Sequence, residues 1–222
     1  MTDALQFWRV GPGVRVGIGD KSAERLGHYL WVLDSMALAG TIATTSADVA
    51  RKANVSAALV RKDLARLGQM GTRGSGYEVA TLLRGLRHRL GLSEPMPAAW
   101  IGAPALRRRI NVARILARYD CPVVAVFDDE ASERGEIVQD LKVRPMSALP
   151  GAATSLQLGL GVVAVDGQSA QAAAEALVRA GVTRLLNLGE TPLAVPSNVV
   201  VENLSVSARL ASLLARSAGG PH

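Results

Sequence analysis

The chain has 222 residues, of which 49% are apolar and only 4% are aromatic. This length suffices for one large domain or two small ones with a substantial core. The single cysteine, Cys121, excludes an internal disulfide and a cysteine-rich metal site, and it fits a reducing cytoplasm. No stretch approaches the roughly 18 apolar residues of a membrane span, and the N-terminus lacks the pattern of a signal peptide. We therefore expect no metal, no membrane association and a cytoplasmic location.

The net charge of +6 is concentrated in the first part of the chain. Residues 1–92 hold 13 Lys and Arg against 7 Asp and Glu, whereas residues 93–222 hold 12 of each. Clustered cations bind nucleic-acid phosphates, although a solvated surface of mixed charge is the simpler alternative. The helix-turn-helix pattern in the same region favours binding to double-stranded DNA.

An N-terminal arm, residues 1–20, lacks clear periodicity and precedes a DNA-binding domain predicted over residues 21–92. Leucines at helical spacing indicate a first helix over residues 21–39.

Two shorter helices follow, joined by a tight turn. Ser46 is expected to cap a helix over residues 47–52, and Ser56 a helix over residues 57–67. Asn54 suits the left-handed turn residue between them. Two short helices in this arrangement are typical of a helix-turn-helix.

The second of these helices carries the cations that would read DNA. Its predicted buried side is formed by Val60, Leu64 and Leu67. Arg61, Lys62 and Arg66 are then exposed, with Ser56 at the helix start. Such side chains contact phosphates or guanine edges in the major groove.

Residues 69–79 are rich in glycine and predict a β-hairpin, the wing of a winged-helix domain. Arg73 stands between glycines that allow close approach to a phosphate chain, and such a wing tip can enter the minor groove. A nucleotide-binding loop is the alternative for these glycines, but no strand-then-helix context surrounds them.

A linker, residues 93–97, is followed by an α/β domain over residues 98–204 and by a terminal helix and tail, residues 205–222. Short strands alternate with helices, which indicates a Rossmann-like, doubly wound parallel sheet. The expected strands are 98–102, 123–127, 160–165, 184–188 and 198–201. The expected helices are 105–118, 169–180 and 205–216.

The first strand-helix turn of this domain carries a broken dinucleotide fingerprint. Gly102 occupies the first of three glycine positions, while Pro104 and Arg107 occupy the second and third. The cations at 107–109 also stand at a predicted helix start, where the helix dipole disfavours them. Either they close the site, leaving a dimerisation scaffold, or they bind a more anionic ligand. We expect weak or absent NADH binding.

Several motifs carry a resemblance to a known family. In the first domain they are Arg61-Lys62-Asp63-Leu64, Arg73-Gly74 and Gly76-Tyr77. In the second they include Val126-Phe127-Asp128, Ala180-Gly181-Val182 and Val200-Val201-Glu202-Asn203. With these segments the chain resembles the Rex family of redox-sensing transcriptional repressors.

The resemblance implies that Arg61 and Lys62, together with Arg73 and Tyr77 of the wing, hold operator DNA. It implies a homodimer whose terminal helix packs against the partner subunit. It also implies that NADH releases the DNA and that NAD+ competes with NADH. The candidate residues for binding NAD(H) are Gly102, Ala103, Leu106, Asp128 and Asn187.

An oxidoreductase is the rival from another class, since Rossmann domains serve dehydrogenases. The three histidines are poorly placed for it, and no catalytic motif is found, so we expect no enzymatic activity. The α/β domain also resembles the CoA-binding domain of succinyl-CoA synthetase, but it lacks that family's phosphohistidine segment. The favoured interpretation is a Rex-like repressor acting as a homodimer on an inverted repeat. It responds either to NAD(H), to another anionic ligand, or to none.

Overall fold

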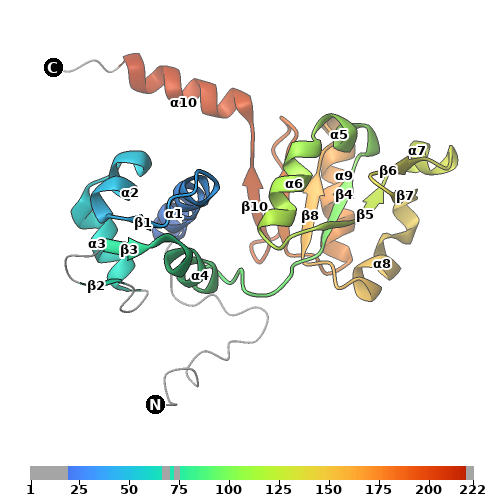
Figure 1. Ribbon diagram of the computed structural model, residues 1–222. Coiled ribbons are helices and arrows are strands. Elements are labelled where there is room, and N and C mark those ends of the chain that lie inside the picture. Colours follow the sequence, from blue (N-terminus) through green and yellow to red (C-terminus); the bar gives the residue numbers. More distant parts are fainter. Residues whose placement is uncertain (1–19, 67–70, 73–75, 219–222) are drawn as a thin grey trace. The chain divides into compact units, whose positions relative to one another are not determined.

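The computed structural model describes residues 20–66, 71–72 and 76–218 (Figure 1). These residues form two compact units, which divide between Ser93 and Glu94.

The first unit contains four helices and a small antiparallel sheet among the residues described. The helices are α1 (Asp20–Leu38), α2 (Ser46–Ala53), α3 (Ala57–Ala65) and α4 (Val79–Arg89). The strands, in the spatial order β1-β3-β2, are β1 (Ala43–Thr44), β3 (Gly76–Glu78) and β2 (Gly71–Thr72). A helix-turn-helix followed by a hairpin is the winged-helix arrangement that the sequence predicts.

The caps of the two short helices follow local chemistry. Asn54 adopts the left-handed conformation (φ 54°, ψ 48°), and Ser56 Oγ accepts the Leu59 N–H at 3.2 Å, as expected. The expected cap at Ser46 is wrong, because α2 begins one residue earlier. Thr45 caps it, since its Oγ1 accepts the Asp48 N–H at 3.1 Å and also donates to the Asp48 carboxylate.

The second unit is built on a seven-stranded sheet in the order β10-β9-β8-β4-β5-β7-β6. All neighbours are parallel except β6 and β7. The strands are β4 (Ala98–Ile101), β5 (Val123–Phe127), β6 (Ile137–Val138), β7 (Leu141–Arg144), β8 (Leu160–Val163), β9 (Arg184–Asn187) and β10 (Val200–Asn203). The order reverses between β4 and β8, so this is the doubly wound sheet that was expected, and ligands of such sheets bind at that switch point.

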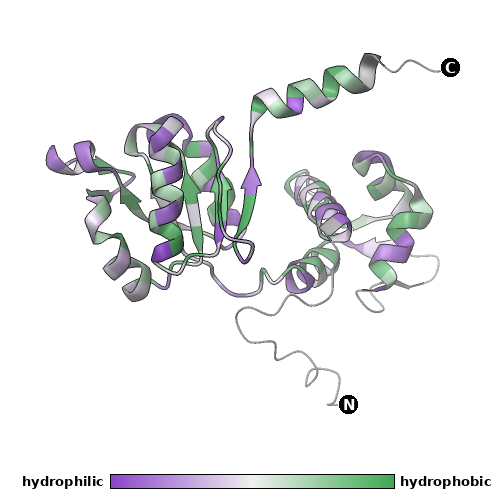
Figure 2. Cartoon of the chain, turned by 180° about the vertical axis from the view of Figure 1, so that it is seen from behind, coloured by the Kyte–Doolittle hydropathy of each residue, from purple (hydrophilic) through white to green (hydrophobic). Residues whose placement is uncertain are grey.

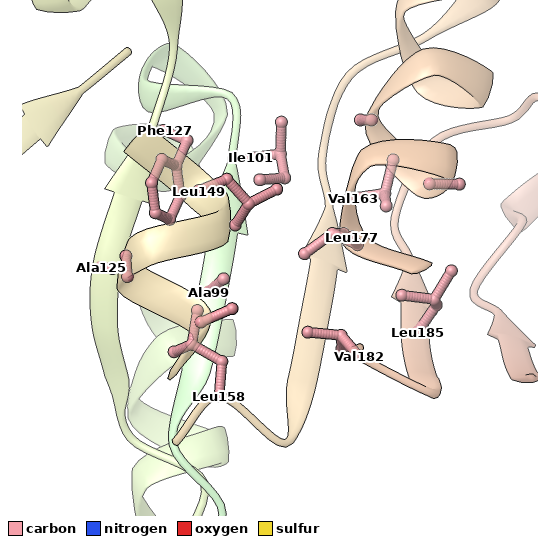
Figure 3. Packing of buried hydrophobic residues seen from close by; sticks show 14 of the residues in the cluster. Ala99, Ile101, Ala125, Phe127, Leu149, Leu158, Val163, Leu177, Val182 and Leu185 are labelled. Carbon is pink, nitrogen blue, oxygen red and sulfur yellow. The ribbon is translucent and has the colours of Figure 1, made fainter. Parts of the chain in front are cut away.

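Helices cover both faces of this sheet. Along β4, Ala99 and Ile101 join one buried cluster, whereas Trp100 joins the other, because successive strand residues face opposite sides. Figure 3 shows the first cluster, in which Leu149 and Leu177 pack against the sheet. These leucines belong to α8 (Leu149–Ser155) and α9 (Gly167–Arg179).

The expected single helix over residues 105–118 is wrong. The chain forms α5 (Ala103–Arg108) and α6 (Ile110–Arg118), separated by Arg109 in a non-helical conformation (φ −114°, ψ 32°). The helix starts early because Pro104 has the backbone angle of a first helical turn and needs no N–H there.

Several short elements between β5 and β8 escaped the sequence analysis. They are α7 (Asp129–Glu133), β6, β7, η2 (Met146–Ala148) and α8. Segments of two to seven residues are too short to show a helical period.

The last helix, α10 (Val206–Ala218), presents an apolar stripe to solvent (Figure 2). Its large exposed apolar side chains are Val206, Leu210, Leu213 and Leu214. Among the helices described, none has the length and apolar content to cross a membrane.

Candidate functional site

Helix α3 separates its residues as the sequence predicts. Val60 and Leu64 are buried, while Arg61, Lys62 and Arg66 are exposed. Arg61 Nη1 donates a long hydrogen bond (3.3 Å) to the Ser46 hydroxyl at the start of α2. The cationic side chains therefore face outward from one side of the helix-turn-helix.

The hairpin beside this helix is partly described. Tyr77 is half-buried in β3 and pairs with Thr44 on one side and Gly71 on the other. Gly76 (φ 76°) lies so close to β1 that an added Cβ would be 2.5 Å from the Thr44 carbonyl oxygen. Only glycine fits there. Arg73, the proposed wing-tip contact, and Leu67 lie outside the described residues.

Asp63 clamps α3 to α1 from the side of α3 opposite Arg61. Its Oδ2 accepts the Arg25 Nε–H at 2.9 Å and the Tyr29 hydroxyl at 3.1 Å, and its Oδ1 accepts Arg25 Nη2 at 3.1 Å. The side chain of Asp63 is only 3% exposed. The hydrogen bonds from Arg25 lower the pKa of Asp63, while burial and the Asp63 charge raise the pKa of Tyr29 to about 12.

The sequence analysis treated Asp63 only as part of a motif. Its position at helical spacing from Val60 was a signal that this carboxylate points inward with the apolar side chains, since Asp63 is buried. A buried carboxylate needs a partner, and Arg25 and Tyr29 supply it.

In the second unit, the candidate ligand-binding residues gather at the carboxyl edge of the sheet. Gly102 follows β4 with φ 103° and ψ 85°. An added Cβ would be 2.8 Å from Val165 Cγ1 and 2.9 Å from the Ala164 carbonyl oxygen. This glycine is therefore required for close packing between the segments that follow β4 and β8.

Asp128, at the end of β5, uses both carboxylate oxygens on backbone amides. Its Oδ2 accepts the Ala103 N–H at 3.1 Å, and its Oδ1 accepts the Ala131 N–H at 2.9 Å as the cap of α7. The carboxylate thus lies at the first turn of α5, the turn on which a dinucleotide pyrophosphate would be bound.

Two arginines of the α5–α6 junction are held by oxygens of the chain itself. Arg107 forms an ion pair with Glu136, which also accepts Arg134 Nε at 2.8 Å. The hydrogen bonds from Arg134 and Arg107 lower the pKa of Glu136. Arg109 Nη1 donates to the Leu188 carbonyl oxygen at 2.8 Å, across the end of the sheet.

The remaining candidates for the cofactor lie inside the fold. Ala103 and Leu106 are fully buried. Asn187 is 1% exposed: its Nδ2 donates to the Thr191 carbonyl oxygen and to Asn203 Oδ1, each at 2.8 Å, and its Oδ1 accepts the Gly189 N–H at 3.1 Å. The side chains of these three residues serve the packing of the edge.

These residues do not fit a dinucleotide. A Rossmann loop holds the pyrophosphate by backbone amides and by close approach at small residues. In α5 the Ala103 amide is bound to Asp128, Pro104 has no N–H, and the third glycine position is Arg107.

Comparison with known proteins covers most of the chain. A family model described as "Putative DNA-binding protein N-terminus" matches residues 17–65. The redox-sensing transcriptional repressor Rex of Desulforamulus reducens is 34% identical over 193 residues, which cover 87% of this chain and 92% of that protein. Rex of Pelotomaculum thermopropionicum is 32% identical over 87% of this chain and 91% of its own length.

Solved structures agree with these relatives. RSP, a Rex-family repressor, superposes with a TM-score of 0.76 at 25% identity, over 91% of this chain and 96% of that one. A structure of RSP in complex with β-NAD+ and operator DNA superposes equally well, covering 94% of that chain. With such identity over most of its length, this chain belongs to the Rex family of redox-sensing transcriptional repressors.

Proposed function

We propose that this protein represses transcription as a homodimer that binds an inverted-repeat operator in the cytoplasm. The observation that carries the proposal is the cationic side of α3, whose Arg61 and Lys62 are exposed while Asp63 fixes the helix from behind. The solved complex of RSP with operator DNA supports it.

The proposed contacts follow from the geometry of a helix-turn-helix. α3 enters the major groove, where Arg61 and Lys62 reach bases or phosphates and Ser56 and Arg66 contact the backbone. Tyr77 supports the hairpin, whose Arg73 reaches the adjacent minor groove. No catalytic role is assigned to any residue.

The proposed dimer rests on α10. Four large apolar side chains along this helix are exposed in a single chain, and a contiguous apolar stripe of this kind is typical of an interface. We propose that the stripe packs against the partner subunit. A two-fold dimer then requires half-sites one or two helical turns apart.

Fluorescence anisotropy at fixed salt tests the function. The chain is titrated onto a Rex-type inverted repeat and onto a scrambled duplex of the same composition. We expect at least about a thousandfold tighter binding to the repeat, the lower end of the usual specificity ratio. Equal affinity for both duplexes would reject a specific operator.

The assembly needs its own control. We expect wild type to sediment as a dimer and Leu210→Asp/Leu214→Asp to sediment as a monomer with weakened operator binding, because the charges interrupt the apolar stripe. A monomeric wild type would reject the dimer without bearing on the recognition helix.

A further inference from the structure

We propose that this chain has replaced the dinucleotide of its family by contacts of its own side chains, so that its binding to DNA does not respond to NADH. The DNA half of this statement rests on the function proposed above, whereas the ligand half can be tested without DNA.

The first contact replaces the pyrophosphate. An anion at the start of a Rossmann helix is held by the unpaired amides of the first turn. In α5, Asp128 already accepts the Ala103 N–H, and Pro104 has none to offer. Ala105 therefore holds the one first-turn amide without a partner among the residues described.

The second contact lies on the β5 side of the switch point. Arg107 stands where the fingerprint has its third glycine, and its ion pair with Glu136 joins α5 to the hairpin of β6 and β7. In the sheet order this hairpin lies beyond β5, whose end carries Asp128. The ion pair thus joins an element that follows β4 to one that lies beyond β5. It spans the end of β5, where the ribose of a dinucleotide would be bound.

The third contact lies on the other side of the switch point. Arg109 binds the carbonyl oxygen of Leu188, which follows β9, while β8 lies between β9 and β4 in the sheet. Gly102 is in van der Waals range of the segment that follows β8, as the position of an added Cβ shows. Side-chain contacts therefore cross the carboxyl edge of the sheet on both sides of the switch point between β4 and β8.

The segment that follows β9 is fixed at further points. Asp166 Oδ1 accepts the Glu190 N–H at 3.0 Å, and an added Cβ on Gly189 would be 2.6 Å from the same oxygen. Glu190 in turn accepts the Ser205 hydroxyl at 2.6 Å and the Val206 N–H at 3.0 Å. The bridged edge is thereby connected to the start of α10 without any ligand.

A more anionic ligand is the competing interpretation of the arginines, and their pairing argues against it. Arg107 and Arg134 share the carboxylate of Glu136, and Arg109 is bound to a carbonyl oxygen. α5 is also only six residues long, so its dipole adds little for a phosphate.

Isothermal titration calorimetry of the full chain with NADH, NAD+ and NADPH tests the ligand half, with the Desulforamulus reducens relative as positive control. We expect no saturable heat for wild type up to about 1 mM nucleotide, a limit near −4 kcal/mol. Saturable binding of NADH or NAD+ in the micromolar range would overturn the proposal. Binding of NADPH alone would also overturn it and would favour the anion site.

The matched variants test the cause. Pro104→Gly/Arg107→Gly restores the glycine positions, and Pro104→Gly/Arg108→Gly removes the neighbouring exposed arginine instead. We expect the first variant to bind NADH at least about tenfold more tightly than the 1 mM limit and the second to show no binding. Circular dichroism and operator binding confirm that both fold. Equal NADH binding by the two folded variants would overturn the proposal that Pro104 and Arg107 prevent dinucleotide binding.

Operator binding with and without NADH tests the regulatory half. We expect NADH to change the operator affinity of wild type by less than about twofold, against the roughly 5- to 150-fold of common allosteric couplings. Release of the DNA by NADH would overturn the proposal. Failure to bind the operator in the absence of NADH would instead reject the proposed function and leave the calorimetric result standing.

Discussion

Two clusters of cations in this molecule, one on α3 and one at the α5–α6 junction, differ in the partners that their side chains have within the chain. Arg61 and Lys62 are exposed, and within the described residues the only hydrogen bond given for either side chain is a long one from Arg61 to a hydroxyl. Arg107 and Arg109 are exposed as well, but the side chain of each is bound by an oxygen from a distant segment. Consecutive cations in a sequence therefore predict a ligand site only where the fold leaves them without internal partners.

The difference arises from where the acceptors lie. On α3 the nearest carboxylate, Asp63, points inward and is taken by Arg25, so it cannot neutralise the outer side. At the sheet edge, Leu188 follows the parallel strand β9, whereas Glu136 precedes the antiparallel strand β6, whose start lies at the same edge, so both acceptors come beside the arginines. We expect three measurable effects in the first unit and one in the second to depend on this difference in side-chain partners.

The largest effect is expected from Asp63→Ala. It removes a buried carboxylate and leaves Arg25 and Tyr29 without their acceptor, which costs about 3 kcal/mol as for a broken buried pair. Amide hydrogen exchange of α1 and α3 in the full chain measures the loss. The control is Asp48→Ala, whose exposed ion pair with Arg51 is screened by solvent and contributes little to stability. Equal losses in the two variants would refute the clamp.

The second effect is the alkaline titration of Tyr29. Its folded-state pKa of about 12 lies above the ordinary value of 10.0, so its stabilising contribution is complete below pH 10 and is lost as pH rises through the folded-state value. A rise of about 2 pKa units corresponds to about 2–3 kcal/mol. The difference between the tyrosinate titrations of wild type and Tyr29→Phe isolates this phenol. A difference curve centred near pH 10 would contradict the predicted shift.

The third effect concerns DNA. Arg61→Ala is expected to weaken operator binding by about 1–3 kcal/mol if Arg61 reads a base. The control, Arg84→Ala, removes one positive charge from α4, where Arg84 donates to the Thr81 hydroxyl. Anisotropy on operator and scrambled DNA separates the roles, because an equal loss on both duplexes would make Arg61 a phosphate contact.

Much of the first unit could be predicted from sequence because its signals are local. The cap at Ser56, the left-handed Asn54 and the apolar spacing of Val60 and Leu64 all lie within a few residues of what they determine. The error at Ser46 was a shift of one residue, which local rules do not resolve.

The carboxyl edge of the sheet could be predicted only in part. Pro104 and Arg107 showed that the fingerprint is broken, and the alternation of strands and helices predicted a doubly wound parallel sheet. The partners could not be found in the same way, because Glu136 is 29 residues from Arg107 and Leu188 is 79 residues from Arg109. The break at Arg109 accompanies that long-range contact, so local helical periodicity could not reveal it.

The smallest effect is expected at Glu190, which connects this edge to α10. Glu190→Gln removes the negative charge of the carboxylate that accepts hydrogen bonds from the Ser205 hydroxyl and the Val206 N–H. The first amides of α10 should therefore exchange faster, while the exchange of the sheet amides is unchanged. The hydrogen bond from Ser205 lowers the pKa of Glu190 in the folded chain. In wild type the protection should therefore persist above the ordinary carboxylate pKa and be lost as pH falls through the lower folded value, whereas in Glu190→Gln it should not titrate.

Glu202→Gln is the matched control for Glu190, because Glu202 also faces α10 through an exposed ion pair with Arg209 at 3.7 Å. Such a pair holds the helix weakly, so we expect no measurable change in exchange. If both variants loosen α10 equally, any nearby negative charge suffices, and the edge is not specifically tied to α10. If only Glu190→Gln does so, the polar groups of this edge bind other parts of the chain. On α3, by contrast, the cationic side chains remain exposed to a ligand.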